Sequence, residues 1–266
     1  MSNKLIDKVK DLEVRMEAPG LVIEPDDPRD ILKSVKLGAH TPPSFSLRGY
    51  AHPVLDQGQT GACAAYTAVQ MLYIMLSRLM QTSTEHLLPS PLALYYEARD
   101  KEGTLNQDAG VTLRGIMKTL KNRGMIPNVV FPERKDVFKA PPDFKNRLYL
   151  SRYERIPVNR LTPESIKTIL FEEKLPIFGG FLIPRSQMSD FNVRWTGDFK
   201  DPPKGDFPFY AHAMLVTGYD EATNRFELLN SWGPDIGRGG WFTAPESWFN
   251  SNRVCMGLFT LSTELF

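Results

Sequence analysis

Residues 62–80, ACAAYTAVQMLYIMLSRLM, form the segment that most restricts how this chain can fold. Its nineteen positions are nearly all apolar, which approaches the length that a bilayer requires. Gln70 lies at the centre of the segment and Arg78 near its end, and both side chains are costly in a hydrocarbon layer. We therefore expect a buried central helix in a folded body, and no insertion into a membrane.

The composition is that of an ordinary globular protein, with 42% hydrophobic and 24% charged residues among 266. Lys and Arg number 32 against 31 Asp and Glu, so the net charge of +1 gives no field that would hold a nucleic acid. The first seventeen residues carry eight charges where a signal peptide would have an apolar core. We expect an intracellular protein without a signal peptide or a transmembrane segment.

The amino-terminal 41 residues are predicted to form an extension ahead of the main domain. Apolar residues at one helical spacing indicate a charged amphipathic helix over residues 3–17. Six prolines between residues 18 and 56 then predict an extended connector, with at most a short helix around residues 31–36. The domain itself is expected to span residues 42–266.

The first half of that domain is predicted to be helical and the second half to form strands. Helices are predicted over residues 62–80, 91–99 and 112–123, the last of them stopped by Gly124. Short apolar runs at 177–183, 212–220, 225–233 and 239–244 predict antiparallel strands. This order favours an α+β fold with a helical lobe at about 55–150, a strand-rich lobe at about 151–266, and a site in the cleft between them.

Cys63 is the first of four residues that indicate chemistry. Gly58, Gly61 and small neighbours place it at a tight turn that opens the central helix. Unpaired backbone N–H groups and the helix dipole favour an anion there. We expect this position, with a neighbouring imidazolium, to lower the pKa of the thiol and make it nucleophilic.

The other three residues are His212, Asn230 and Gln57. A turn at 219–224 between two adjacent strands would bring Asn230 back beside His212, where its amide oxygen can orient the imidazole. Trp232 would shield that hydrogen bond from water. The side-chain amide of Gln57 and the backbone N–H of Cys63 are predicted to form an oxyanion hole.

At these residues the sequence resembles the papain-like cysteine peptidases. PVLDQGQTGACAAYTA at 53–68 resembles their nucleophile segment, HAMLVTGYD at 212–220 their histidine strand, and NSWGPDIGRGGWF at 230–242 their asparagine block. Residues 108–124 and 254–261 resemble the cleft-wall segment and the last strand. The resemblance implies a two-lobe fold with a helical lobe and a β-barrel-like lobe, hydrolysis of peptide or protein substrates, and no cofactor or metal.

The resemblance also implies three substrate-binding residues, Gly110, Ala211 and Leu261, with Leu261 near the base of an apolar pocket. The family usually has a cysteine at the place of Thr60, and Cys255 is left without a bridging partner other than the nucleophile. We therefore expect no structural disulfide and a reducing compartment such as the cytoplasm.

Three functions remain open on the sequence alone. The first is a peptidase, the second a transpeptidase or ligase that uses the same acyl-enzyme, and the third a catalytically silent binding protein with the same fold. Residues 1–41 are either a flexible arm or an intramolecular inhibitor. In related zymogens such a segment crosses the cleft in the direction opposite to a substrate.

Overall fold

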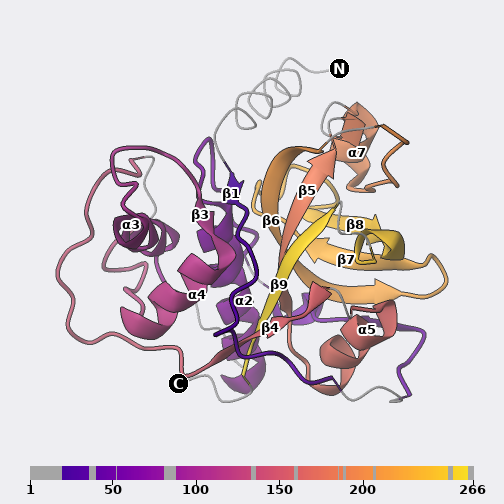
Figure 1. The fold of residues 1–266 in the computed structure, drawn as a ribbon, viewed down its shortest axis with the longest axis horizontal. Coiled ribbons are helices and arrows are strands. Elements are labelled where there is room, and N and C mark those ends of the chain that lie inside the picture. Colours follow the sequence, from indigo (N-terminus) through magenta and orange to yellow (C-terminus); the bar gives the residue numbers. More distant parts are fainter. Residues whose placement is uncertain are drawn as a thin grey trace.

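The computed structural model describes residues 20–35, 40–51, 53–80, 88–132, 136–158, 161–184, 186–187, 190–205, 208–250 and 254–262. The helix predicted over residues 3–17 lies outside these ranges. Figure 1 shows helices α2, α3 and α4 on one side of the molecule and the sheet on the other, with β1 (Leu21–Val22) between them.

The central helix α2 spans Cys63–Met80, and its side chains from Cys63 to Leu76 are buried. Within the described ranges it is the one helix long and apolar enough to cross a bilayer, and 78% of it is buried inside the protein. Its apolar surface is therefore used by the core, as the sequence predicted. Gln70 is satisfied there, because it accepts from the Leu55 N–H and donates to the Asn230 carbonyl.

Two further helices pack beside α2, on the side of the molecule away from the sheet. Helix α3 (Pro91–Glu102) begins at Ser90, whose side chain caps it, and ends at Gly103 with a positive φ of 74°. Helix α4 (Leu113–Asn122) is capped by Thr112, which belongs to the short strand β3 (Val111–Thr112). Both helices lie close to the predicted positions, because local capping residues mark their ends.

The second half of the chain supplies most of a seven-stranded sheet. Its order is β4-β9-β5-β6-β7-β8, and β2 pairs with β6 outside this path. The named pairs are antiparallel. The strands are β2 (Ser44–Ser46), β4 (Tyr153–Ile156), β5 (Ile177–Pro184), β6 (Pro208–Asp220), β7 (Arg225–Leu229), β8 (Trp241–Pro245) and β9 (Cys255–Leu261).

The remaining elements cover the sheet and its ends. Helix α5 (Pro163–Glu172) carries a capping box made by Thr162 and Ser165, and helix α7 (Phe191–Thr196) begins at Asp190. Short 3-10 helices occupy Arg48–Tyr50 and Glu246–Trp248. We did not predict α5 or α7 from the sequence.

The structure confirms an α+β fold of the papain type and corrects one local prediction. Residues 31–35 are not helical, because Leu32 forms a parallel bridge with Arg155 at the free edge of β4. The Lys33 N–H donates to the Arg155 carbonyl at 2.7 Å, and the Arg155 N–H donates to the Ile31 carbonyl at 2.8 Å. An open sheet edge thus captures a segment whose own helix signal was weak.

Candidate active site

The amino terminus of α2 carries Cys63 against strand β6. Thr67, one turn later, donates to the carbonyl of Ala213 at 3.1 Å, which fixes the helix to the residue that follows His212. Burial raises the pKa of the Cys63 thiol to about 12, although the N–H groups of Ala213, Ala64 and Cys63 itself lower it in part. The expected lowering of this pKa is therefore wrong for the present covered state, since no water solvates a thiolate there.

His212 and Asn230 are brought together by the antiparallel pair β6 and β7. Leu215 lies opposite Leu229, and Asn230 follows directly after β7. The Nε2 atom of His212 lies 2.8 Å from Oδ1 of Asn230, which also accepts from the Ser231 N–H at 2.7 Å. An oxygen that accepts twice keeps the proton of the neutral imidazole on Nε2.

The second ring nitrogen of His212, Nδ1, is buried and makes no hydrogen bond with any residue that the structure describes. It is the ring position left for exchange with a thiol or a substrate. Burial lowers the pKa of His212 to about 4, against the opposing effect of the hydrogen bond that it donates to Asn230. The imidazole is therefore neutral in the covered state.

Two aromatic rings stack on the imidazole. The ring centroid of Trp232 lies 4.6 Å from that of His212 at an interplanar angle of 25°, and the centroid of Tyr210 lies 5.5 Å away at 28°. Both aromatic residues are almost fully buried. Trp232 thus contacts the imidazole that it was expected to shield, and its shielding role stays a prediction, whereas Tyr210 is an addition that the sequence analysis missed.

Gln57 lies beside Ser231, the residue after Asn230, and its side chain also bonds to its own loop. Its Nε2 donates to the Thr60 carbonyl at 2.8 Å, and its Oε1 accepts from Ser231 Oγ at 2.6 Å. Its backbone N–H also donates to the Ser231 carbonyl. These bonds fix the loop before Cys63 to the segment that follows Asn230.

Asp108 links the nucleophile loop to the facing wall. Its carboxylate accepts from the Gly61 N–H at 3.0 and 3.1 Å and from the hydroxyl of Tyr95. Tyr95 in turn accepts from the N–H of Gly110, at 3.0 Å. Gly110 has a positive φ of 72°, so the chain turns there into β3.

Residues 20–33, which we name the strap, lie between the two sides of the molecule. Leu21 and Val22 of β1 pair in parallel with Val111 and Thr112 of β3. Gly20 packs against Ala211, and a Cβ added to it would press on the Ala211 carbonyl and lie 3.0 Å from the Tyr210 ring and hydroxyl. A residue without a side chain is thus required where the strap passes the strand that carries His212.

Leu21 is 7% exposed and fills an apolar position beside Gly180. The surrounding pocket is lined by Leu113 of α4 and by Met256, Gly257 and Phe259 of β9, together with the strap itself. Burial of a leucine side chain contributes about 2 kcal/mol to holding the strap. Leu261, the expected pocket base, lies further along β9, opposite Tyr153, and is not among these lining residues.

The sequence-predicted residues therefore divide into two sets. His212 contacts Asn230 and Trp232 directly, Gln57 is joined to this group through Ser231, and Cys63 lies against Ala213, two residues after Ala211 in the same strand. Gly110 lies on the facing wall, and Leu261 lies at the far end of β9. In the described ranges, no group of three or more His, Cys, Asp or Glu side chains is placed to hold a metal ion.

Tyr210, Asp108 and Gly20 are the residues that sequence reasoning missed. Tyr210 precedes His212 by two positions in a strand, so alternation alone places both on one face. Asp108 stands at the start of the segment that resembles the cleft wall. No pattern indicated Gly20, because its contact with Ala211 joins two segments far apart in the sequence.

Comparisons with known proteins agree with this arrangement. The profile of the Peptidase C1-like family matches residues 206–254. The chain is 28% identical over 254 residues to an uncharacterized peptidase C1-like protein of Acanthamoeba polyphaga mimivirus, covering 85% of this chain and 80% of that protein.

Solved structures show the same fold. Xylellain, a cysteine protease from Xylella fastidiosa, matches with a TM-score of 0.80 and 25% identity over 92% of this chain and 96% of that one. Procathepsin B S9 from Trypanosoma congolense matches in fold with a TM-score of 0.74 and 14% identity, covering 99% of each chain. In its cysteine, histidine and asparagine segments, in their order along the chain and in its fold, the chain is similar to papain-like C1 peptidases.

Proposed function

We propose that this protein is a cysteine peptidase that cleaves peptide bonds through Cys63 and His212. The observation that carries the proposal is the imidazole of His212, held by Asn230 at Nε2 and without a partner at Nδ1 beside the start of α2. In the proposed reaction His212 takes the proton of the Cys63 thiol, the resulting thiolate attacks the carbonyl carbon, and the protonated His212 gives that proton to the leaving amine as the peptide C–N bond breaks. Water, deprotonated by neutral His212, then releases the acid from the acyl-enzyme.

Gln57 and the backbone N–H of Cys63 are the proposed donors to the oxyanion. An amide nitrogen carries two N–H bonds, and the Nε2 of Gln57 gives one of them to Thr60. The second N–H is available to the oxygen that becomes negative in the tetrahedral intermediate. The hydrogen bonds with Ser231 and Thr60 then orient the side-chain amide of Gln57 toward that oxygen.

The strap is the proposed intramolecular inhibitor. It takes the strand position beside β3 and the apolar position beside Gly180, which a substrate would need. Its parallel pairing with β3 means that a peptide lying antiparallel to β3 would run in the opposite direction. We propose that substrates bind in that antiparallel direction, between β3 and Ala211.

Substitution of Gly20 tests the inhibition. Gly20→Leu cannot keep the strap against the Ala211 carbonyl, so the full chain should hydrolyse a leucine-containing peptide at least tenfold faster than the unchanged protein. Gly49→Leu is the matched control, since nothing lies within 4 Å of a Cβ placed there. Equal rates for the two variants, with both folded, would leave the strap without an inhibitory role.

Product analysis tests the reaction itself. The Gly20→Leu chain is incubated with the peptide, with and without an added amine, and the products are identified by mass spectrometry. Hydrolysed fragments support the peptidase, a fragment joined to the amine supports the transpeptidase or ligase, and intact peptide supports the silent binding protein. Cys63→Ala in the same chain should give no product, and product formation there would refute the role of Cys63.

A reducing compartment is proposed for the same protein. Cys63 and Cys255 are both free and buried. The catalytic thiol would need a reducing environment to remain a thiol.

A further inference from the structure

The first turn of α4 holds a carboxylate that belongs to the strap. The backbone N–H of Arg114 donates to Glu24 Oε1 at 2.7 Å, and Nη1 of the same residue donates to Glu24 Oε2 at 2.7 Å. One carboxylate is thus bound through both oxygens, by a guanidinium and by an N–H at the positive end of a helix. The first turn of α4 and the Arg114 side chain thus form a binding site for a carboxylate, which Glu24 occupies. We call this site the receptor.

The rest of the Arg114 guanidinium also contacts only the strap. Nε and Nη2 donate to the two carboxylate oxygens of Asp30 at 2.9 and 2.7 Å, and Nη2 donates to the Pro25 carbonyl at 3.1 Å. Among the described residues, every hydrogen-bond partner of this guanidinium lies in the strap. Its side chain is only 8% exposed under the strap, so departure of the strap would uncover a cation that has lost its carboxylate partners.

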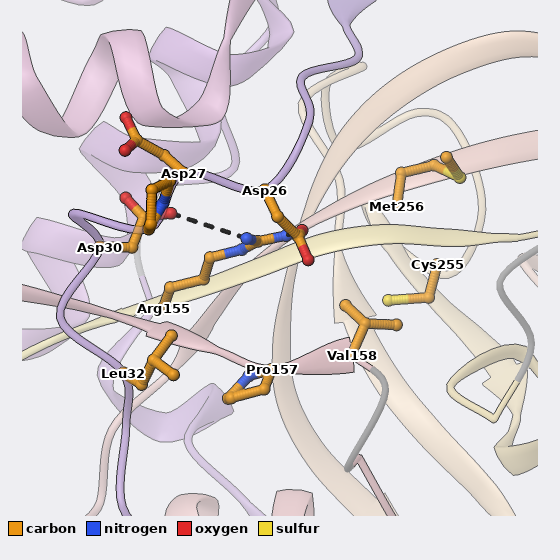
Figure 2. Close-up of a pocket in the computed structure, with 10 residues that line it drawn as sticks. Asp26, Asp27, Asp30, Leu32, Arg155, Pro157, Val158, Cys255 and Met256 are labelled. Atoms are coloured by element: carbon orange, nitrogen blue, oxygen red, sulfur yellow. Dashed lines mark hydrogen bonds and ion pairs between the residues drawn. The ribbon is translucent and has the colours of Figure 1, made fainter.

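Two more cations of the body face acidic residues of the strap. Arg155 of β4 contacts Asp26 and lies 3.6 Å from Asp30, and Lys118 lies 3.7 Å from Asp27. Figure 2 shows the three aspartates around Arg155, at a cavity of about 510 Å³. The surface under residues 24–30 of the strap therefore carries basic side chains, which face the acidic side chains of that part of the strap.

The receptor has a fixed register relative to the reactive centre. Gly20 lies at Ala211, next to His212, and Leu21 fills the apolar pocket. Glu24 follows three residues later, on the side away from Cys63. A substrate that runs opposite to the strap would lay its amino-terminal side over Arg114, three residues before the side chain in the pocket.

We propose that Arg114 and the first turn of α4 form a substrate subsite that selects Asp or Glu three residues before the residue in the pocket of Leu21. The inference rests on the proposed peptidase function and on the proposed substrate direction. Glu24 of the strap then acts as the built-in competitor for this subsite.

Two peptides that differ at one position test the subsite. Both carry leucine for the pocket, and three residues before it one has Glu and the other Gln. The enzyme is the full chain with Gly20→Leu, Glu24→Gln and Asp30→Asn, whose opening is checked by alkylation of Cys63. We expect kcat/KM to be about tenfold higher for the Glu peptide, and the ratio to shrink in high salt.

Substitution of the receptor completes the test. Arg114→Gln in the same chain should bring the ratio of the two rates to about one, whereas Lys121→Gln, on the exposed side of α4, should leave the ratio unchanged. A third peptide with Lys at the position should be cleaved several-fold more slowly than the Gln peptide, which tests the subsite even where Arg114→Gln does not fold.

The outcomes separate the two proposals. Cleavage of all three peptides at equal rates overturns the subsite and leaves the peptidase intact. A chain with an alkylatable Cys63 that cleaves none of them overturns the peptidase and the subsite together. A preference for Glu that survives Arg114→Gln places the selection elsewhere and overturns the assignment to Arg114.

Discussion

The reactive centre and the strap above it are held by different kinds of interaction. Cys63, His212 and Asn230 are positioned by a helix start and two adjacent strands, through uncharged hydrogen bonds and ring stacking. The strap is held by one leucine, a short strand and a series of ion pairs. Ion pairs with a separate segment are lost when that segment lifts and can be replaced by pairs with another ligand, whereas the main-chain geometry of the centre stays in place. The comparison suggests a rigid centre under a removable cover.

Lys33 shows how the far end of the strap follows the same pattern. Its ammonium lies 3.1 Å from Glu154 and also contacts Glu173, so one cation of the strap joins two carboxylates of the body. At Lys33 the strap carries the positive charge and the body the negative charge, which is the reverse of the arrangement at Arg114. Both ends of the strap therefore depend on charge complementarity with the body.

The largest expected effect concerns the thiol of Cys63. A pKa of about 12 in the covered state leaves a thiolate fraction on the order of 10⁻⁵ at pH 7. We expect iodoacetamide to alkylate Cys63 about a thousandfold faster in Gly20→Leu than in the unchanged chain. In the unchanged chain the rate should rise tenfold with each pH unit up to about pH 12, because only the thiolate reacts.

Cys255 is the internal control for that measurement. Its pKa is also raised to about 12 by burial, and it lies outside the reactive centre. Because Cys255 lines the cavity beside the strap, peptide mapping by mass spectrometry should find a smaller rise in its alkylation rate than in that of Cys63. Equal alkylation of Cys63 in the two chains would contradict the removable cover.

The next effect tests the rigid centre. Gln57→Ala in the Gly20→Leu chain should lower kcat about a hundredfold with little change in KM, the scale of a lost oxyanion donor. Ser231→Ala, which removes only the bond to Gln57 Oε1, should cost less, and Gln59→Ala should cost nothing measurable. A Gln57→Ala enzyme with normal kcat would remove this residue from the oxyanion hole.

A smaller effect is expected from the charges of the strap. Arg114→Gln in the otherwise unchanged chain should raise hydrolysis of a neutral peptide about tenfold, since two carboxylates of the strap lose their shared partner. Lys121→Gln is the control on the same helix. An unchanged basal rate in Arg114→Gln would show that the strand pairing and Leu21 hold the strap without the ion pairs.

The last prediction is that reductant does not change the thermal stability of the protein. Both cysteines are free, so the midpoint of thermal unfolding should be the same with and without dithiothreitol. Calorimetry checks this directly. A fall of several degrees in reductant would indicate a native bridge, whose loss costs about 2–5 kcal/mol.

Much of the fold was predictable because its signals are local. The length of α2, the stop of α4 at Gly124 and the strands β5 to β8 follow from periodicity and from turn residues. Helix α7 was missed because it is only six residues long, whereas α5 has a local signal, the capping box of Thr162 and Ser165, that the sequence analysis overlooked. The register that sets Asn230 beside His212 could be expected from the turn at 219–224, and the pairing of β6 with β7 confirms that these strands are adjacent.

The sequence by itself determined the α+β fold and the adjacency of the strands that carry His212 and lead to Asn230, because these rest on residues close together in the chain. The association of Cys63 with them was expected from the family resemblance, since Cys63 lies in the other half of the chain. Only the tertiary structure decided where the strap lies. Glu24 and Arg114 are 90 residues apart, and Gly20 meets Ala211 from the opposite end of the chain. Such contacts depend on charges and shapes that come together after folding, and no local pattern in residues 20–33 specifies them.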